Sequence, residues 1–190
     1  YQTNLRHCDY YLHLVSQIEK PMSGSELRRL VDSISNDLSN VQAAWRWATA
    51  HGVSEIMLQC SLALSEFYTL TGLIREGERE FLTAVQFVQL NQDDLQGFSL
   101  SVKEAALGLV LCGHSNLLIR LGRFEQAIPQ IERAIQIAQR IHSLRVEVSA
   151  NCLLAHMKTA KHTSCAAPIA LDDAIQMARQ IGDLRAEIKV

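Results

Sequence analysis

The chain has 190 residues, of which 48% are hydrophobic and 20% charged, and its formal net charge at pH 7 is -2. This balance is typical of one globular domain or a short repeat array, and it gives none of the basic excess that nucleic acid or an acidic membrane surface favours. No stretch has the 18 or so apolar residues of a membrane span and no secretory signal is present, so we expect a cytoplasmic protein without direct nucleic-acid or membrane contact.

The numbers of helix-breaking residues and cysteines indicate the fold class and the redox state of the thiols. Only 3 prolines and 9 glycines interrupt the chain, which favours an all-α fold. The 5 cysteines are odd in number, widely spaced and lack a CxxC pair, as is usual for reduced thiols in the cytoplasm.

The first half contains two apolar-periodic stretches. Residues 3–19 predict a helix that ends at 21–25. Residues 26–48 then predict either one long helix or two helices joined near Ser39 and Asn40, closed by His51 and Gly52.

Two further helices are predicted at 56–70 and 73–90, with a break at Thr71 and Gly72 and a polar loop at 91–97. A long helix follows at 98–121. It is apolar on all sides through 105–111, so we expect it to be buried between its neighbours.

The most regular amphipathic pattern runs from Gly122 to Arg140. Pro129 lies inside it, where proline costs about 3 kcal/mol in a helix interior, so the helix is expected to start near Ala127 or to be kinked. Helices at 144–160 and 165–181 and the start of another at 183–190 complete a prediction of about nine helices.

Several of these helices share an internal sequence repeat. Small and large residues recur with the same spacing in three segments, and a fourth segment fits more loosely. The three are Gly77, Phe81 and Ala84; Ala127, Ile131 and Ala134; and Ala167, Leu171 and Ala174; the looser one is Val41, Trp45 and Ala48. Gly72 and Gly122 each precede the last alanine of their segment by twelve residues.

This pattern resembles the tetratricopeptide repeat family, most closely in the run from Asn116 to Ala127. The opening tryptophan and closing proline of that family are missing. The resemblance covers residues 53–190 and implies antiparallel helix pairs stacked as a right-handed superhelix. Its repeats would be 53–97, 98–143 and 144–182, with a further helix starting at 183–190.

The first half carries a second resemblance. The run from Leu38 to Ala48, LSNVQAAWRWA, and the histidine-containing helix around His7 are similar to the segment after the nucleotide-binding and winged-helix parts of bacterial STAND-type signal-transduction ATPases. This implies that residues 1–52 link a repeat sensor to an upstream ATPase part. The sensor would bind a protein, peptide or small-molecule inducer and control autoinhibition and oligomerisation of a transcription regulator.

The chain contains neither of the phosphate-binding loops GxxxxGK[ST] and GxGxxG, and it lacks the zinc-binding motif HExxH. We therefore expect that this part of the protein is not an enzyme and binds no cofactor or metal. A stand-alone repeat scaffold is the main alternative, and a helical hydrolase or metal enzyme is a third.

The tetratricopeptide resemblance places the concave groove on the first helix of each pair. The polar positions expected there are Gln59, Glu66, Thr69, Asn116, Arg120, Ser149, His156 and Thr159, interspersed with Leu62, Leu109, Cys112 and Cys152. These positions would suit a peptide or small ligand, or they are merely solvated or covered by stacking. Leu62 replaces the lysine of the carboxylate-clamp variety, which disfavours a peptide C-terminus.

The cluster Trp45, Arg46 and Trp47 is the remaining feature. Adjacent residues on a helix point about 100° apart, so at least one tryptophan leaves the core. Packing between helices is favoured over contact with the upstream part.

Overall fold

The structure is a computed structural model that describes residues 2–90 and 98–160. These residues form α-helices and one short 3₁₀ helix, and no strand occurs among them, which confirms the all-α prediction. The elements are α1 (Gln2–Ser16), η1 (Gln17–Glu19), α2 (Gly24–Asn36), α3 (Leu38–Ala50), α4 (Ser54–Leu70), α5 (Ile74–Leu90), α6 (Phe98–Arg120), α7 (Phe124–Ile141) and α8 (Leu144–Ala160).

The count of eight α-helices in the described residues differs from the predicted nine for two reasons. The stretch 26–48 is two helices, and the predicted helices at 165–181 and 183–190 lie outside the described residues. The break falls at Asp37, whose φ of -107° and ψ of 19° leave the helical region, slightly before the predicted joint.

A capping box begins α2 two residues earlier than predicted. The Ser23 backbone N–H donates to the Glu26 carboxylate at 2.7 Å, and the Glu26 N–H donates to Ser23 Oγ at 3.3 Å. The two contacts satisfy donors that have no partner within the helix. The hydrogen bonds from Ser23 lower the pKa of Glu26.

Two three-residue connections have matching geometry. Gly72, between α4 and α5, has φ 74°, and Gly122, between α6 and α7, has φ 72°. Glycine adopts this left-handed conformation without steric cost. Both predicted breaks are confirmed, and α5 and α7 start two residues after their glycine.

The repeated small and large residues lie on buried faces. Gly77 and the alanine and aromatic positions that follow it in α5 are buried, as are the corresponding positions of α7 and α3. The hydrophobic members of these faces are Phe81, Ala84, Ala127, Ile131, Ala134, Val41, Trp45 and Ala48, each at most 1% exposed. The segment from Ala167 to Ala174 lies outside the described residues.

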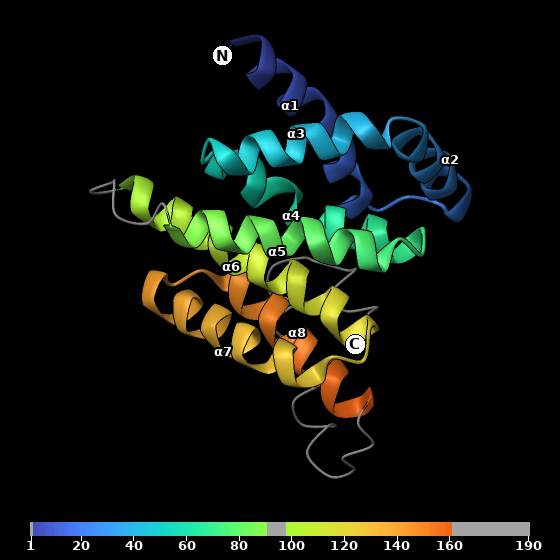
Figure 1. The fold of residues 1–190 in the computed structure, drawn as a ribbon. Helices are drawn as coiled ribbons and strands as arrows, with labels where there is room; N and C mark the ends of the chain where they lie inside the picture. The colour runs from blue at the N-terminus through green and yellow to red at the C-terminus, as the bar shows by residue number, and fades with distance from the viewer. Residues whose placement is uncertain (1, 91–97, 161–190) are drawn as a thin grey trace.

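Helix α6 occupies the centre of the packing. The helices follow one another in layers from α1 and α3 through α4 and α5 to α7 and α8 (Figure 1), and α6 contacts α4, α5, α7 and α8. Its glycines permit close approach, because a Cβ on Gly108 would lie 2.6 Å from Cγ1 of Val146 and a Cβ on Gly113 would lie 3.0 Å from Cζ of Phe81. The predicted burial of this helix is confirmed.

Helix α6 also passes a length and composition test for a membrane span. Its segment Leu100–Arg120 has a hydropathy of 1.2 in its most apolar window, and 78% of that window is buried inside the protein. Most of this window is therefore covered by other helices of the protein.

Pro129 lies inside α7, which starts at Phe124 rather than near Ala127. The start at Ala127 is therefore wrong. Proline removes the N–H that would bond to the carbonyl of Glu125. Both Pro129 and Glu125 are exposed, so the proline lies on the solvent-facing side of α7.

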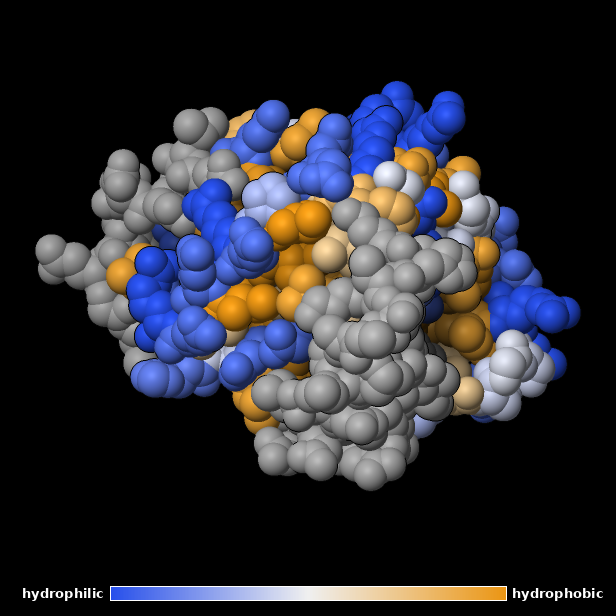
Figure 2. Space-filling model, turned by 90° about the horizontal axis from the view of Figure 1, so that it is seen from below, coloured by the Kyte–Doolittle hydropathy of each residue, from blue (hydrophilic) through white to orange (hydrophobic). Residues whose placement is uncertain are grey.

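Some large apolar side chains remain in contact with solvent. Seen from below, hydrophobic side chains gather between hydrophilic ones (Figure 2). The exposed large hydrophobic residues are Tyr10, Leu70, Leu82, Phe87, Leu100 and Leu144.

Candidate functional site

A pocket of about 240 Å³ lies where η1, α4, α6 and α8 meet. Apolar, hydroxyl, amide, thiol and charged groups all contribute to its wall. The lining residues are Ile18, Glu19, Leu62, Ser65, Glu66, Cys112, Gly113, Asn116, Arg120, Ser149, Cys152, Leu153 and His156.

A chain of hydrogen bonds between α4 and α6 fixes the polar wall. Ser65 Oγ donates to the Gly113 carbonyl at 2.9 Å, and Asn116 Nδ2 donates to Ser65 Oγ at 3.0 Å. The same amide nitrogen lies 3.4 Å from Thr69 Oγ1. Because both contacts use the nitrogen, they hold the Asn116 carboxamide in one orientation.

Charged groups of both signs border the pocket. Glu66 on α4 is half-buried, whereas Arg120 at the end of α6 is exposed. Within the described part of the chain, Arg120 has no ion-pair partner. The Glu19 carboxylate accepts a hydrogen bond from Arg145 Nη2 at 2.7 Å, so η1 is tied to α8 beside the pocket.

Two thiols face the pocket from α6 and α8. Burial raises the pKa of Cys112 to about 12, and the nearby Cys152 contributes in the same direction. Cys112 is therefore a neutral thiol near pH 7 and behaves as a small apolar wall group rather than a nucleophile.

The structure brings most of the predicted groove positions together. The polar positions that line the pocket are Glu66, Asn116, Arg120, Ser149 and His156, and the interspersed positions that do so are Leu62, Cys112 and Cys152. Whether they bind a ligand stays a prediction.

The other predicted positions lie elsewhere. Gln59 is exposed on α4, away from the pocket wall, and Leu109 is fully buried because α6 is covered on all sides. Thr69 does not line the pocket, but its hydroxyl contacts the side chain of Asn116, which does line it. The side chain of Thr159 lies outside the described residues.

Several lining residues escaped the sequence analysis. Ser65 precedes the predicted Glu66, and Leu153 follows Cys152, so a helical face one residue wider would have included them. Ile18 and Glu19 carry no such signal, because nothing in the residue spacing indicates that η1 reaches α4 and α8.

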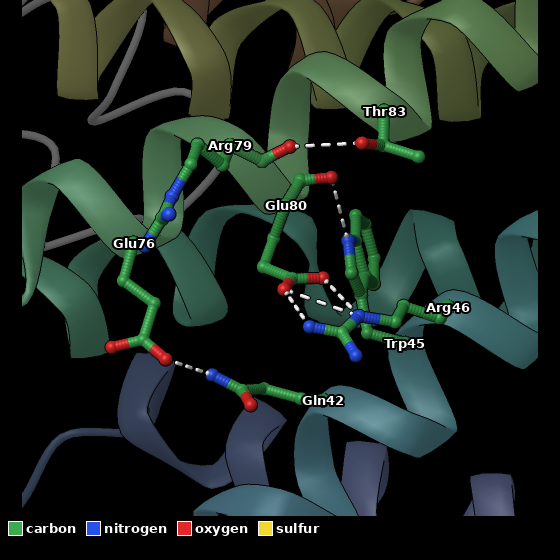
Figure 3. A network of polar contacts seen from close by, with 7 residues as sticks. All are labelled: Gln42, Trp45, Arg46, Glu76, Arg79, Glu80 and Thr83. Atoms are coloured by element: carbon green, nitrogen blue, oxygen red, sulfur yellow. Dashed lines mark hydrogen bonds and ion pairs between the residues drawn. The ribbon is translucent and has the colours of Figure 1, made fainter.

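Two residues of the tryptophan cluster, Trp45 and Arg46, belong to a polar network between α3 and α5 (Figure 3). Trp45 is buried, and its ring packs at a tilt against Phe81 with ring centroids 5.1 Å apart. Its Nε1 donates to the Glu80 carbonyl at 3.4 Å. The half-buried Trp47 stacks on His51 at 4.1 Å. Trp47 is thus only partly buried, and it packs against the hydrophobic core.

Two polar contacts in this network repeat with a spacing of four on both helices. Gln42 Nε2 donates to Glu76 Oε1 at 2.6 Å, and Arg46 donates to both carboxylate oxygens of Glu80, with Nε 2.9 Å from Oε2. The hydrogen bonds to Glu80 raise the pKa of Arg46. The bidentate pair is committed to holding α3 on α5, so its groups are not free for a ligand.

A second buried polar cluster lies between α5, α6 and α7. His114 Nδ1 is 2.9 Å from Gln130 Oε1, and its Nε2 is 3.6 Å from Glu78 Oε1. Glu78 also lies 3.5 Å from Arg123 Nη1. Burial lowers the pKa of His114, so this ring is mainly neutral near pH 7.

The described residues contain no group of three or more His, Cys, Asp or Glu side chains placed to hold a metal ion. The pocket wall combines amide, hydroxyl, thiol and charged groups with apolar side chains.

Comparison with family models, curated proteins and solved structures found no match for this chain.

Proposed function

We propose that the chain is a non-enzymatic, tetratricopeptide-like sensor domain of a STAND-type regulatory ATPase. The observation that carries the proposal is the pocket, because it gathers five polar positions that the repeat resemblance assigns to the concave groove, from three different helices. A ligand that bound there in one conformation of the parent and not in the other would shift the parent between an autoinhibited state and an oligomerising one.

The repeat architecture is the second support. The helix starts of α5 and α7, the glycine before each and the buried face of each share one spacing. Such agreement is expected if α4 with α5 and α6 with α7 are successive copies of one helix pair in a right-handed superhelix.

The gene itself gives the first test. We expect an in-frame GxxxxGK[ST] motif followed by a winged-helix segment upstream of the codon for Tyr1. A full gene without this motif would contradict the sensor proposal and favour the stand-alone scaffold.

The parent protein gives the second test. Deleting residues 53–190 from the parent should relieve autoinhibition, so ATP should drive a larger oligomeric fraction in analytical ultracentrifugation than it does for the intact parent. An unchanged or smaller fraction would contradict a controlling role for the array.

A further inference from the structure

The interior and the mouth of the pocket differ in polarity. Ile18 and Cys112 are fully buried, and burial keeps the Cys112 thiol neutral. Leu62 and Leu153 are half-buried and add apolar wall from α4 and α8. Arg120 is the last residue of α6 and is exposed, so its side chain lies where the pocket meets solvent. The wall therefore runs from an apolar interior to a cationic mouth.

The polar groups inside the pocket already bond to the protein. Ser65 Oγ donates to the Gly113 carbonyl at 2.9 Å, and Ser149 Oγ donates to the Arg145 carbonyl at 2.8 Å. The amide nitrogen of Asn116 bonds to Ser65. Because a hydroxyl has one hydrogen to donate, these contacts use the hydrogens of both serines. The interior therefore favours the aliphatic part of a ligand over a polar part.

The charges of the wall favour an anionic group at the mouth. Glu19 accepts a hydrogen bond from Arg145 Nη2 at 2.7 Å, and Glu66 also interacts with another group of the protein. Among residues 2–90 and 98–160, by contrast, Arg120 has no ion-pair partner. A guanidinium presents its donors in a planar fork that matches the two oxygens of a carboxylate. A carboxylate is therefore the ligand group that Arg120 suits best.

The dimensions of the pocket limit the rest of the ligand. Cys112 and Arg120 both line it and are eight residues apart on α6, which is about 12 Å of helix rise. The volume is about 240 Å³, whereas sites for drug-sized molecules begin at about 300 Å³. A narrow aliphatic chain with one charged end fits these dimensions.

We propose that the pocket binds a medium-chain aliphatic monocarboxylate, with its carboxylate paired to Arg120 at the mouth and its chain against Leu62, Leu153 and Ile18. This inference rests on the proposed function, because it names the ligand class of the same pocket.

Isothermal titration calorimetry on the full chain tests it with four probes. Acetate, butanoate and hexanoate share the carboxylate and differ in chain length, and hexanamide keeps the chain without the charge. We expect hexanoate to bind with a Kd below about 1 mM and hexanamide to bind about tenfold more weakly or worse, since a hydrogen bond between charged groups is lost. Each added methylene that becomes buried should tighten binding about fourfold.

Matched variants assign the charge. Arg120→Gln should weaken hexanoate about tenfold and leave hexanamide unchanged. Arg28→Gln removes an exposed arginine of α2 outside the pocket and should change neither affinity. Equal melting temperatures of the two variants would show that the loss of hexanoate binding is not a loss of folding.

Four outcomes would overturn the inference: no hexanoate binding at about 1 mM, hexanamide binding as tightly as hexanoate, equal weakening of both by Arg120→Gln, or tighter binding of the peptide acetyl-Gly-Gly-Leu than of hexanoate. The peptide result would indicate a site for a peptide C-terminus. Because the upstream motif and the oligomeric response of the parent are measured without any carboxylate ligand, failure here and failure of the sensor proposal remain distinguishable.

Discussion

Gly113 lies where α6 meets the buried ring of Phe81, and this contact leaves no space for a side chain. Gly113→Ala should lower the free energy of unfolding by about 1–2 kcal/mol, because overpacking of about 1–3 kcal/mol exceeds the gain in helix propensity. Urea unfolding followed by circular dichroism measures the change.

Gly24→Ala is the matched control. No heavy atom would lie within 4 Å of the new Cβ at the start of α2, so its stability should equal or slightly exceed that of the wild type. A Gly113→Ala protein as stable as this control would show that Phe81 moves aside without cost.

His114 should make stability depend on pH. Burial lowers its pKa in the folded protein below the usual value of 6.5, against the opposing contacts with Gln130 and Glu78. The unfolded chain therefore binds the proton first, so this contribution is fully present above about pH 6.5 and is lost as the pH falls toward the folded pKa. One titrating group changes the free energy of unfolding by at most about 1.4 kcal/mol per pH unit.

Urea unfolding between about pH 5 and pH 7.5 tests the role of His114. His114→Gln should flatten the profile in this range, while His13→Gln, which changes an exposed histidine of α1, should keep the wild-type profile. Coincident wild-type and His114→Gln profiles would exclude His114 as the source of the dependence.

Individual pocket residues could be predicted only where they follow one another at helical spacing on one face of a helix. Asn116 and Arg120 share one face of α6 by spacing alone, and both line the pocket. Glu19 could not be predicted, because its position depends on how η1 packs against helices distant in sequence.

At the scale of the helix, Pro129 is the main departure from local propensity. Pro129→Ala should raise the free energy of unfolding by about 1–2 kcal/mol, because alanine restores a backbone donor and is the better helix former, while losing the stiffness of proline in the unfolded chain offsets part of the gain. The expected change is a higher urea midpoint.

Pro21→Ala serves as the comparison, since Pro21 is exposed in the connection before α2. There alanine only adds freedom to the unfolded chain, and stability should fall by about 0.4–1 kcal/mol. If Pro129→Ala were destabilising as well, the proline would have a structural role in α7 beyond its backbone.

Helix ends were predictable where a glycine marks them, as at Gly72 and Gly122, whose positive φ angles end α4 and α6. The break at Asp37 was placed slightly late because it has no glycine or proline. The low helix propensity of proline left two alternatives for α7, a start near Ala127 or a kink, whereas the helix starts at Phe124 and includes Pro129.

At the scale of the whole molecule, one hydrophobic core extends from Cys8 in α1 to Met157 in α8. Periodicity predicts which face of each helix is buried, but the partner of that face depends on the packing of all helices together. The contact of α1 with α4 and the pocket beside η1 depend on this packing, so periodicity could not predict them. The boundary between residues 52 and 53 stays a prediction.

The bridge between Glu19 and Arg145 joins residues 126 positions apart, and this separation has a consequence for folding kinetics. Contacts within neighbouring helix pairs close short loops and can form early, whereas this bridge closes a long one and is expected to form after the transition state. Arg145→Ala should therefore leave the folding rate unchanged and speed unfolding about two- to fivefold, the equivalent of about 0.5–1 kcal/mol for a partly exposed pair.

Stopped-flow folding and unfolding in urea would measure both rates. Arg140→Ala provides the comparison, because its partner Glu104 is only 36 residues away on the adjacent α6, so part of its effect should fall on the folding rate. A slower folding rate for Arg145→Ala would place the bridge in the folding nucleus. If it forms late, the contact between η1 and α8 prolongs the lifetime of the folded state without making that state any faster to reach.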